Sequence, residues 1–118
     1  MKHPVYTKGQ LNCAETIIDF FNRNHNTNIP VALGSGMGSG LTIGSVCGAI
    51  NAAAIVIGAQ KGRELPDEEN QAREIVKALL TKIKEKYGSE ICIDLKKSNV
   101  SCQEIINFTY EQLDSLLK

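Results

Sequence analysis

Residues 41–59 read LTIGSVCGAINAAAIVIGA, and this stretch decides the fold class of the chain. Nearly every side chain in it is small or apolar, and no Lys, Arg, Asp or Glu occurs between Arg23 and Lys61. A segment of this length could just span a bilayer. Asn51 near its centre, three glycines and the alanine-rich composition all weaken membrane insertion. We therefore expect no membrane span, but a helix that follows Gly40, ends near Ala59 and is buried by other helices on all sides.

Three further helices are expected, one before the central helix in the sequence and two after it. The first is predicted over Lys8 to Arg23, with Thr7 as its N-cap. Another begins near Pro66 and stops at Gly88, after the clearest apolar repeat in the chain. The last runs from Cys102 to Leu117 behind the capping-box sequence Ser101-Cys102-Gln103-Glu104. The sequence thus predicts an all-α fold, a small antiparallel bundle of about four helices around a small-residue-rich centre.

The connections between these helices carry glycine and one cysteine. Gly62 is suited to a left-handed C-cap of the central helix. The linker from Ser89 to Val100 contains Cys92, and its centre fits either a single turn or a short strand. Glycines before a helix can cradle a phosphate, but the run Gly34 to Gly40 lacks the Lys-Ser/Thr of a P-loop. We expect a packed or flexible loop there, and leave a docked anion or cofactor tail open.

Composition narrows the classes of protein. The chain has 118 residues, which predicts a single helical domain over residues 1–118. Lys plus Arg number 13, as do Asp plus Glu, so the basic excess typical of a nucleic-acid binder is absent. The start, Met1 to Thr7, has no apolar stretch of the kind found in secretory signals. We therefore expect a cytoplasmic protein whose thiols are kept reduced.

The four cysteines, Cys13, Cys47, Cys92 and Cys102, are the candidate functional residues. They form no Cys-x-x-Cys pair, which excludes a zinc knuckle and a thioredoxin motif. Cys13 and Cys102 are expected on inward helix faces, and Cys47 in the buried helix. Cys102 follows an expected N-cap, where unpaired backbone amides and the helix dipole favour a thiolate. Burial as small apolar side chains is the alternative interpretation of all four.

Four blocks of the sequence together resemble the four-cysteine family named C_GCAxxG_C_C, whose members are described as redox-active. The blocks are Leu11-Asn12-Cys13-Ala14-Glu15, Gly34 to Gly38 with Val46-Cys47-Gly48-Ala49, Tyr87-Gly88 with Cys92 and Leu95, and Cys102 with Ile105 and Ile106. They occur in order over about residues 10 to 110. The last glycine of the family's Cys-Gly-Ala-x-x-Gly motif is Ala52 here. The resemblance implies a helical fold and a thiol redox or metal-linked role.

The leading functional hypothesis is reversible disulfide chemistry among the four cysteines, as in a thiol-disulfide oxidoreductase, although the sequence leaves open whether the protein is an enzyme. Cys92 and Cys102 are the favoured pair, because a flexible linker would let Cys92 approach a helix start. Cys13 and Cys47 would then remain as a second pair, but the sequence does not fix which of the three possible connectivities occurs. A zinc or iron–sulfur site on the cysteines is one alternative, and a structural or partner-binding helical module is another. We expect an unidentified redox partner and no cofactor in the leading hypothesis, and leave a homo-oligomer open.

Overall fold

The structure, a computed structural model, describes residues 4–118 and confirms the all-α fold. The first three residues of the Met1 to Thr7 segment lie outside this range. Helices and turns follow in the order α1 (Cys13–His25), η1 (Val31–Gly34), η2 (Gly40–Gly44), α2 (Gly48–Lys61), α3 (Ala72–Tyr87), α4 (Cys92–Lys97) and α5 (Cys102–Leu116). Within residues 4–118, extended pairing is limited to one isolated antiparallel bridge between Val46 and Ile91.

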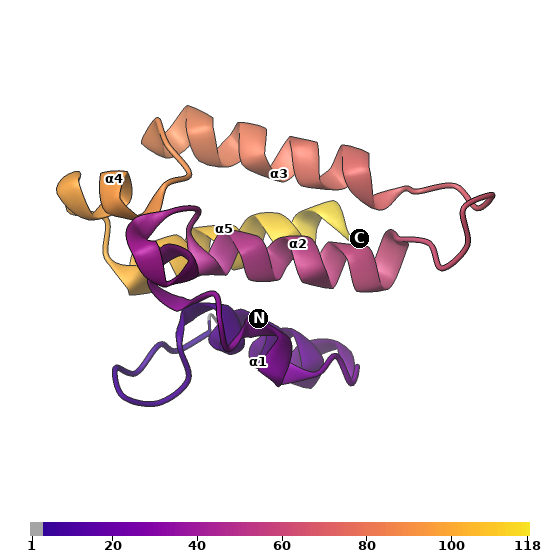
Figure 1. Cartoon of the computed structure of the whole chain (residues 1–118), viewed down its shortest axis with the longest axis horizontal. Helices are drawn as coiled ribbons and strands as arrows, with labels where there is room; N and C mark the ends of the chain where they lie inside the picture. The colour runs from indigo at the N-terminus through magenta and orange to yellow at the C-terminus, as the bar shows by residue number, and fades with distance from the viewer. Residues whose placement is uncertain (1–3) are drawn as a thin grey trace.

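The helices pack around a central pair, α2 and α5, which lie side by side (Figure 1). Helix α3 lies along one side of this pair and α1 along the other, while the short helix α4 lies at one end of the molecule (Figure 1). Helices α1, α2 and α5 all begin near α4, because Cys13, Gly48 and Cys102 line one cavity together with Cys92. Helix α3 runs in the opposite direction.

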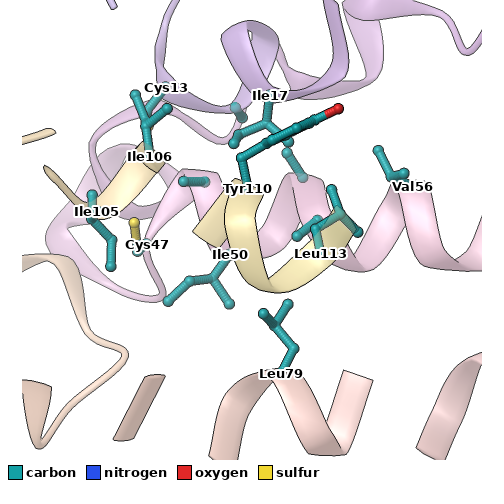
Figure 2. Close-up of a cluster of buried hydrophobic side chains, with 14 of the residues drawn as sticks. Cys13, Ile17, Cys47, Ile50, Val56, Leu79, Ile105, Ile106, Tyr110 and Leu113 are labelled. Atoms are coloured by element: carbon teal, nitrogen blue, oxygen red, sulfur yellow. The ribbon is translucent and has the colours of Figure 1, made fainter. Parts of the chain in front are cut away.

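The core confirms the expected central helix. Ala49, Ala52 and Ala53 of α2 are fully buried, because their small side chains let the neighbouring helices approach closely. Figure 2 shows the core, in which Ile50 and Val56 of α2 lie near Leu113 of α5. In the part of the chain that the structure describes, no helix combines the length and the apolar character that a membrane span requires.

Helix α2 begins later than predicted, at Gly48. The residues before it instead form the turn η2 and the bridge at Val46. Left-handed backbone at Gly40 and Gly44 is the physical reason, since it interrupts a right-handed helix. At the other end, Gly62 is extended and not left-handed, with φ of −82°, so that prediction was wrong.

Helix α1 also begins later than predicted, at Cys13, so Lys8 and Thr7 were wrong assignments for its start. The stretch from Thr7 forms a turn, in which the Gln10 amide donates to the Thr7 carbonyl at 3.0 Å. Gly9 is left-handed in that turn. The N-cap is Asn12, which forms a capping box with Glu15.

The end of α3 and the start of α5 follow the predictions, whereas the start of α3 does not. Gly88 ends α3 as a left-handed C-cap, as expected. Helix α5 begins at Cys102, and the Ser101 side chain accepts a hydrogen bond from the Glu104 amide at 3.0 Å. Helix α3 begins at Ala72 and not near Pro66, because the preceding residues form a separate turn, in which the Glu68 amide donates to the Leu65 carbonyl.

Candidate functional site

All four cysteines line a single cavity of about 80 Å³. They come from four different helices and span most of the chain, from Cys13 to Cys102. All four are free thiols. The cavity wall also includes polar side chains, at Tyr6, Asn12, Ser39 and Lys96, and apolar ones, at Leu95, Val100 and Ile105. The four cysteines, which are remote from one another in the sequence, therefore surround one cavity.

Each cysteine lies at the amino end of a helix. Cys13, Cys92 and Cys102 are the first residues of α1, α4 and α5, and Cys47 is the N-cap of α2. Helix amino ends have unpaired amides and the positive end of the helix dipole. Four such ends converge on one cavity, and backbone amides there act to lower the pKa of the Cys13 and Cys47 thiols.

Burial opposes that effect at the two inner cysteines, Cys13 and Cys47. Burial raises the pKa of Cys47 to about 12, although the Ile50 and Ala49 amides act in the opposite direction. Burial also raises the pKa of Cys13, against the Ser39 backbone amide, and the neighbouring Cys102 adds to the increase. Both inner cysteines are therefore thiols at neutral pH.

The two outer cysteines, Cys92 and Cys102, are half-buried. The structure corrects the prediction of a flexible linker around Cys92. The Cys92 amide donates to the Ser45 carbonyl at 2.7 Å, and the Cys47 amide donates to the Glu90 carbonyl at 3.0 Å. These two bonds flank the bridge between residues 46 and 91, so backbone pairing, and not chain flexibility, brings Cys92 to the cavity.

Glycines let the surrounding backbone approach the sulfurs. A Cβ on Gly48 would lie 2.7 Å from the Cys13 sulfur and 2.5 Å from the Met37 carbonyl oxygen. A Cβ on Gly40 would lie 2.5 Å from the Cβ of Cys92. Real Cβ atoms do not approach this closely, so any larger residue would move the cysteines.

Most of the run from Gly34 to Gly40 serves close packing. A Cβ on Gly34 would lie 2.9 Å from the Glu15 amide nitrogen, and one on Gly38 would lie 3.0 Å from the Asn12 side chain. These glycines therefore hold the loop against the first turn of α1. The sequence predicted either a packed or a flexible loop here, and the loop is packed.

A left-handed turn connects this loop to η2. Ser39, Gly40, Leu41 and Thr42 all have φ between 54° and 67°. Each non-glycine residue in that conformation costs roughly 1–2 kcal/mol. The turn directs the Ser39 amide toward the Cys13 sulfur, where it lowers the pKa of that thiol against the larger effect of burial. Strained backbone thus adjoins the cavity, as is common at functional sites.

Asn12 and Glu15 have structural roles that were not predicted from the sequence. The Asn12 side-chain amide donates to the Gly34 carbonyl at 3.2 Å, which ties the glycine loop to the start of α1. Glu15 accepts from the Asn12 amide and from the Ser35 hydroxyl, each at 2.8 Å. These bonds lower the pKa of Glu15. The sequence signal was the Asn-x-x-Glu spacing of a capping box beginning at Asn12.

Within residues 4–118, no group of three or more His, Cys, Asp or Glu side chains is arranged so that it could hold a metal ion. The four cysteines line the same cavity, but they are not arranged as ligands of one metal ion. Ala52, the departure from the family motif, is fully buried and is not among the residues that line the cavity.

Fold and site together define a small helical protein with four free cysteines around one cavity. Residues 11–116 match the family described as "Putative redox-active protein (C_GCAxxG_C_C)". The chain belongs to this family, as its motifs predicted, and the family description supports a redox role in general terms. No match was found among curated proteins or among solved structures.

Proposed function

We propose that this protein carries out reversible thiol–disulfide chemistry in the cysteine cavity. The observation that carries the proposal is the common cavity itself, which the four sulfurs reach from four helix starts. Disulfide formation requires alpha carbons closer than about 7 Å and one sulfur that can react as a thiolate. The helix amino ends supply the electrostatic support for that thiolate.

The outer and inner cysteines have different roles in this proposal. Cys102 and Cys92 are half-buried and form the pair that reacts first, whereas Cys13 and Cys47 are buried and form a second pair behind it. Oxidation of one pair forms one S–S bond and releases two electrons and two protons to a two-electron oxidant. An external dithiol returns them, and the protein is then reduced again.

The position of Cys102 supports its assignment as the attacking sulfur. It is the first residue of α5, behind a serine N-cap, and it is more exposed than Cys13 and Cys47. Cys13 lies near enough to Cys102 and Cys92 for both to influence its titration, and Cys13 in turn influences Cys47. A disulfide formed at the outer pair could therefore pass inward through Cys13 by exchange.

The test is oxidation of the reduced chain with diamide, followed by mass spectrometry of the intact protein and of its peptides. We expect a disulfide within one molecule, which Cys102→Ser or Cys92→Ser removes and Cys47→Ser leaves in place. Failure of the unsubstituted chain to form any intramolecular disulfide would contradict the proposal. Alkylation of the reduced protein at neutral pH should modify Cys102 first and Cys47 last, and a Cys102 slowest of the four would contradict its assignment.

A variant with all four cysteines replaced by serine separates this proposal from a purely structural role. The proposal predicts that this variant loses the protein's biological activity and keeps its helical content, because Cys47 is the only helix-capping residue that is changed. A purely structural role predicts that the activity is kept. Anaerobic purification with metal analysis and an absorption spectrum tests the alternative of zinc or iron–sulfur ligation.

A further inference from the structure

The segment at residues 4–7, named here the strap, crosses beside the cysteine cavity and is fastened to α5 by Gln103. The Tyr6 amide donates to the Gln103 side-chain oxygen at 2.8 Å. The Gln103 side-chain nitrogen donates to the Pro4 carbonyl at 2.7 Å. One glutamine thus holds the strap at two points, and it is the residue directly after Cys102.

The strap places the Tyr6 side chain in the cavity wall with all four cysteines. Burial raises the pKa of the Tyr6 phenol, and the neighbouring Cys102 and Cys13 add to the increase, while Lys96 acts in the opposite direction. The phenol therefore keeps its proton at neutral pH and is a hydrogen-bond donor beside the sulfurs. Pro4 is fully buried and Tyr6 is half-buried, so the strap packs against the rest of the protein.

The cysteine cavity is small and partly open to solvent. Pockets that take drug-sized ligands measure about 300–1,000 Å³. The cysteine cavity, at about 80 Å³, therefore holds a molecule of only a few heavy atoms. A peptide disulfide, a flavin or a nicotinamide is too large to lie inside this cavity, so while the strap is in place such a molecule reaches the sulfurs only from the open side and reacts more slowly.

We propose that the oxidant of this site is a small hydroperoxide, of the size of hydrogen peroxide, and that Tyr6, held by Gln103, sets this size limit. The inference rests on the proposed disulfide chemistry and names its oxidant. A hydroperoxide is a two-electron oxidant of thiolates that a space of this size admits.

The chemical step balances within the cavity. The Cys102 thiolate attacks one peroxide oxygen, the O–O bond breaks, and the leaving hydroxide takes a proton from the Tyr6 phenol, which solvent then reprotonates. Cys102 is now a sulfenic acid. The Cys92 sulfur displaces its hydroxyl group, which leaves as water with the Cys92 proton. Overall, two thiols and one hydrogen peroxide give one disulfide and two water molecules.

The experiment compares oxidants of different size on the reduced, full-length chain. Hydrogen peroxide, cumene hydroperoxide and oxidised glutathione are each reacted with it, and the intramolecular disulfide is quantified over time by mass spectrometry. We expect hydrogen peroxide to react at least about tenfold faster than either larger oxidant. Equal rates, or a faster reaction with oxidised glutathione, would overturn the inference.

Variants of the strap test the size limit directly. Gln103→Ala should release the strap and reduce the rate advantage of hydrogen peroxide severalfold. Asn107→Ala is the matched control, because it removes only the bond that Gln103 donates to Asn107 at 2.7 Å and leaves both strap bonds. Tyr6→Ala should give the same result as Gln103→Ala and carries the test if that variant does not fold. An unchanged rate ratio in a folded Tyr6→Ala protein would overturn the assignment of Tyr6.

The two proposals fail in different ways. If diamide forms the disulfide and hydrogen peroxide does not, disulfide chemistry stands and the small-hydroperoxide inference is wrong. If neither oxidant produces an intramolecular disulfide, the proposed function itself is wrong.

Discussion

The two ends of the helix bundle differ in the residues that line their cavities and in the conformation of the nearby backbone. At one end, the amino termini of α1, α2, α4 and α5 surround the cysteine cavity, where glycines and left-handed residues allow close backbone contacts. At the other end, the carboxyl termini of α1, α2 and α5 meet around a second cavity of about 420 Å³. His25, Lys61 and Lys118 line that cavity, and basic groups suit the negative ends of helix dipoles.

The carboxyl end is held by ordinary side-chain contacts. His25 lies 2.7 Å from Asp114, and the Phe21 ring stacks on the His25 ring with 4.4 Å between centroids. The Asn24 side chain donates to the Tyr110 hydroxyl at 3.1 Å. The same helices thus have ordinary stabilising contacts at their carboxyl ends, whereas their amino ends surround the proposed redox site, where left-handed residues cost stability.

The largest expected effect is a difference in stability between substitutions at two glycines of α2. Gly48→Ala should destabilise the protein by about 1–3 kcal/mol, because the new Cβ would overlap the Met37 carbonyl oxygen and the Cys13 sulfur. Gly58→Ala is the matched control near the other end of the helix, where no neighbour lies within 4 Å of the new Cβ. It should stabilise the helix by up to about 1 kcal/mol. Urea unfolding of both variants gives the difference, and equal shifts would contradict the contrast between the two ends.

A smaller effect is expected at the carboxyl end. His25→Ala leaves the mostly buried Asp114 carboxylate without its histidine partner, which should cost about 1–2 kcal/mol. Because the pair lies away from the sulfurs, disulfide formation should be unchanged. The midpoint of thermal unfolding and the rate of diamide oxidation measure the two quantities. A change in oxidation rate without a change in stability would show that the two ends are coupled.

Relief of strain at the amino end should stabilise the protein. Thr42 is exposed and has φ of 67°, a conformation that glycine adopts without steric cost. Thr42→Gly should therefore raise the free energy of unfolding by about 1 kcal/mol, whereas Thr81→Gly, at an exposed position of helix α3, should lower it by about 0.3–0.5 kcal/mol. Chemical denaturation of the two variants checks the signs. A destabilising Thr42→Gly would show that the left-handed turn is not strained.

The smallest expected effect concerns pH. The Asn12 amide and the Ser35 hydroxyl hold the pKa of Glu15 below its ordinary value of 4.5. Its contribution to stability is complete above that value and is lost as the pH falls through the lowered pKa. Glu15→Gln should reduce the loss of stability on acidification by less than about 1 kcal/mol. Unfolding free energies measured from neutral pH down to the acid range test this, and parallel pH profiles for both proteins would contradict it.

The inner cysteines could be recognised from the sequence, but their environment could not. Cys13 and Cys47 were predicted as candidates, since they stand in motifs of ordered spacing. The raised pKa of Cys47 results from burial by residues that are remote along the chain. The position of Cys92 could not be predicted either. It depends on backbone hydrogen bonds to a distant segment, and nothing in the sequence around Cys92 indicates that pairing.

Local pattern determined the all-α class, the buried small-residue helix, the Ser101 cap of α5 and the four cysteines as the residues of interest. These features depend on interactions between residues that are close in the sequence, or on side-chain size. Both can be read from the sequence directly. Tertiary structure alone decided that α1, α2, α4 and α5 present their amino ends to one cavity, and that Tyr6 lines it. The physical reason is that such convergence depends on packing between distant segments, on the left-handed turn at Ser39 to Thr42 and on one glutamine that fastens the strap.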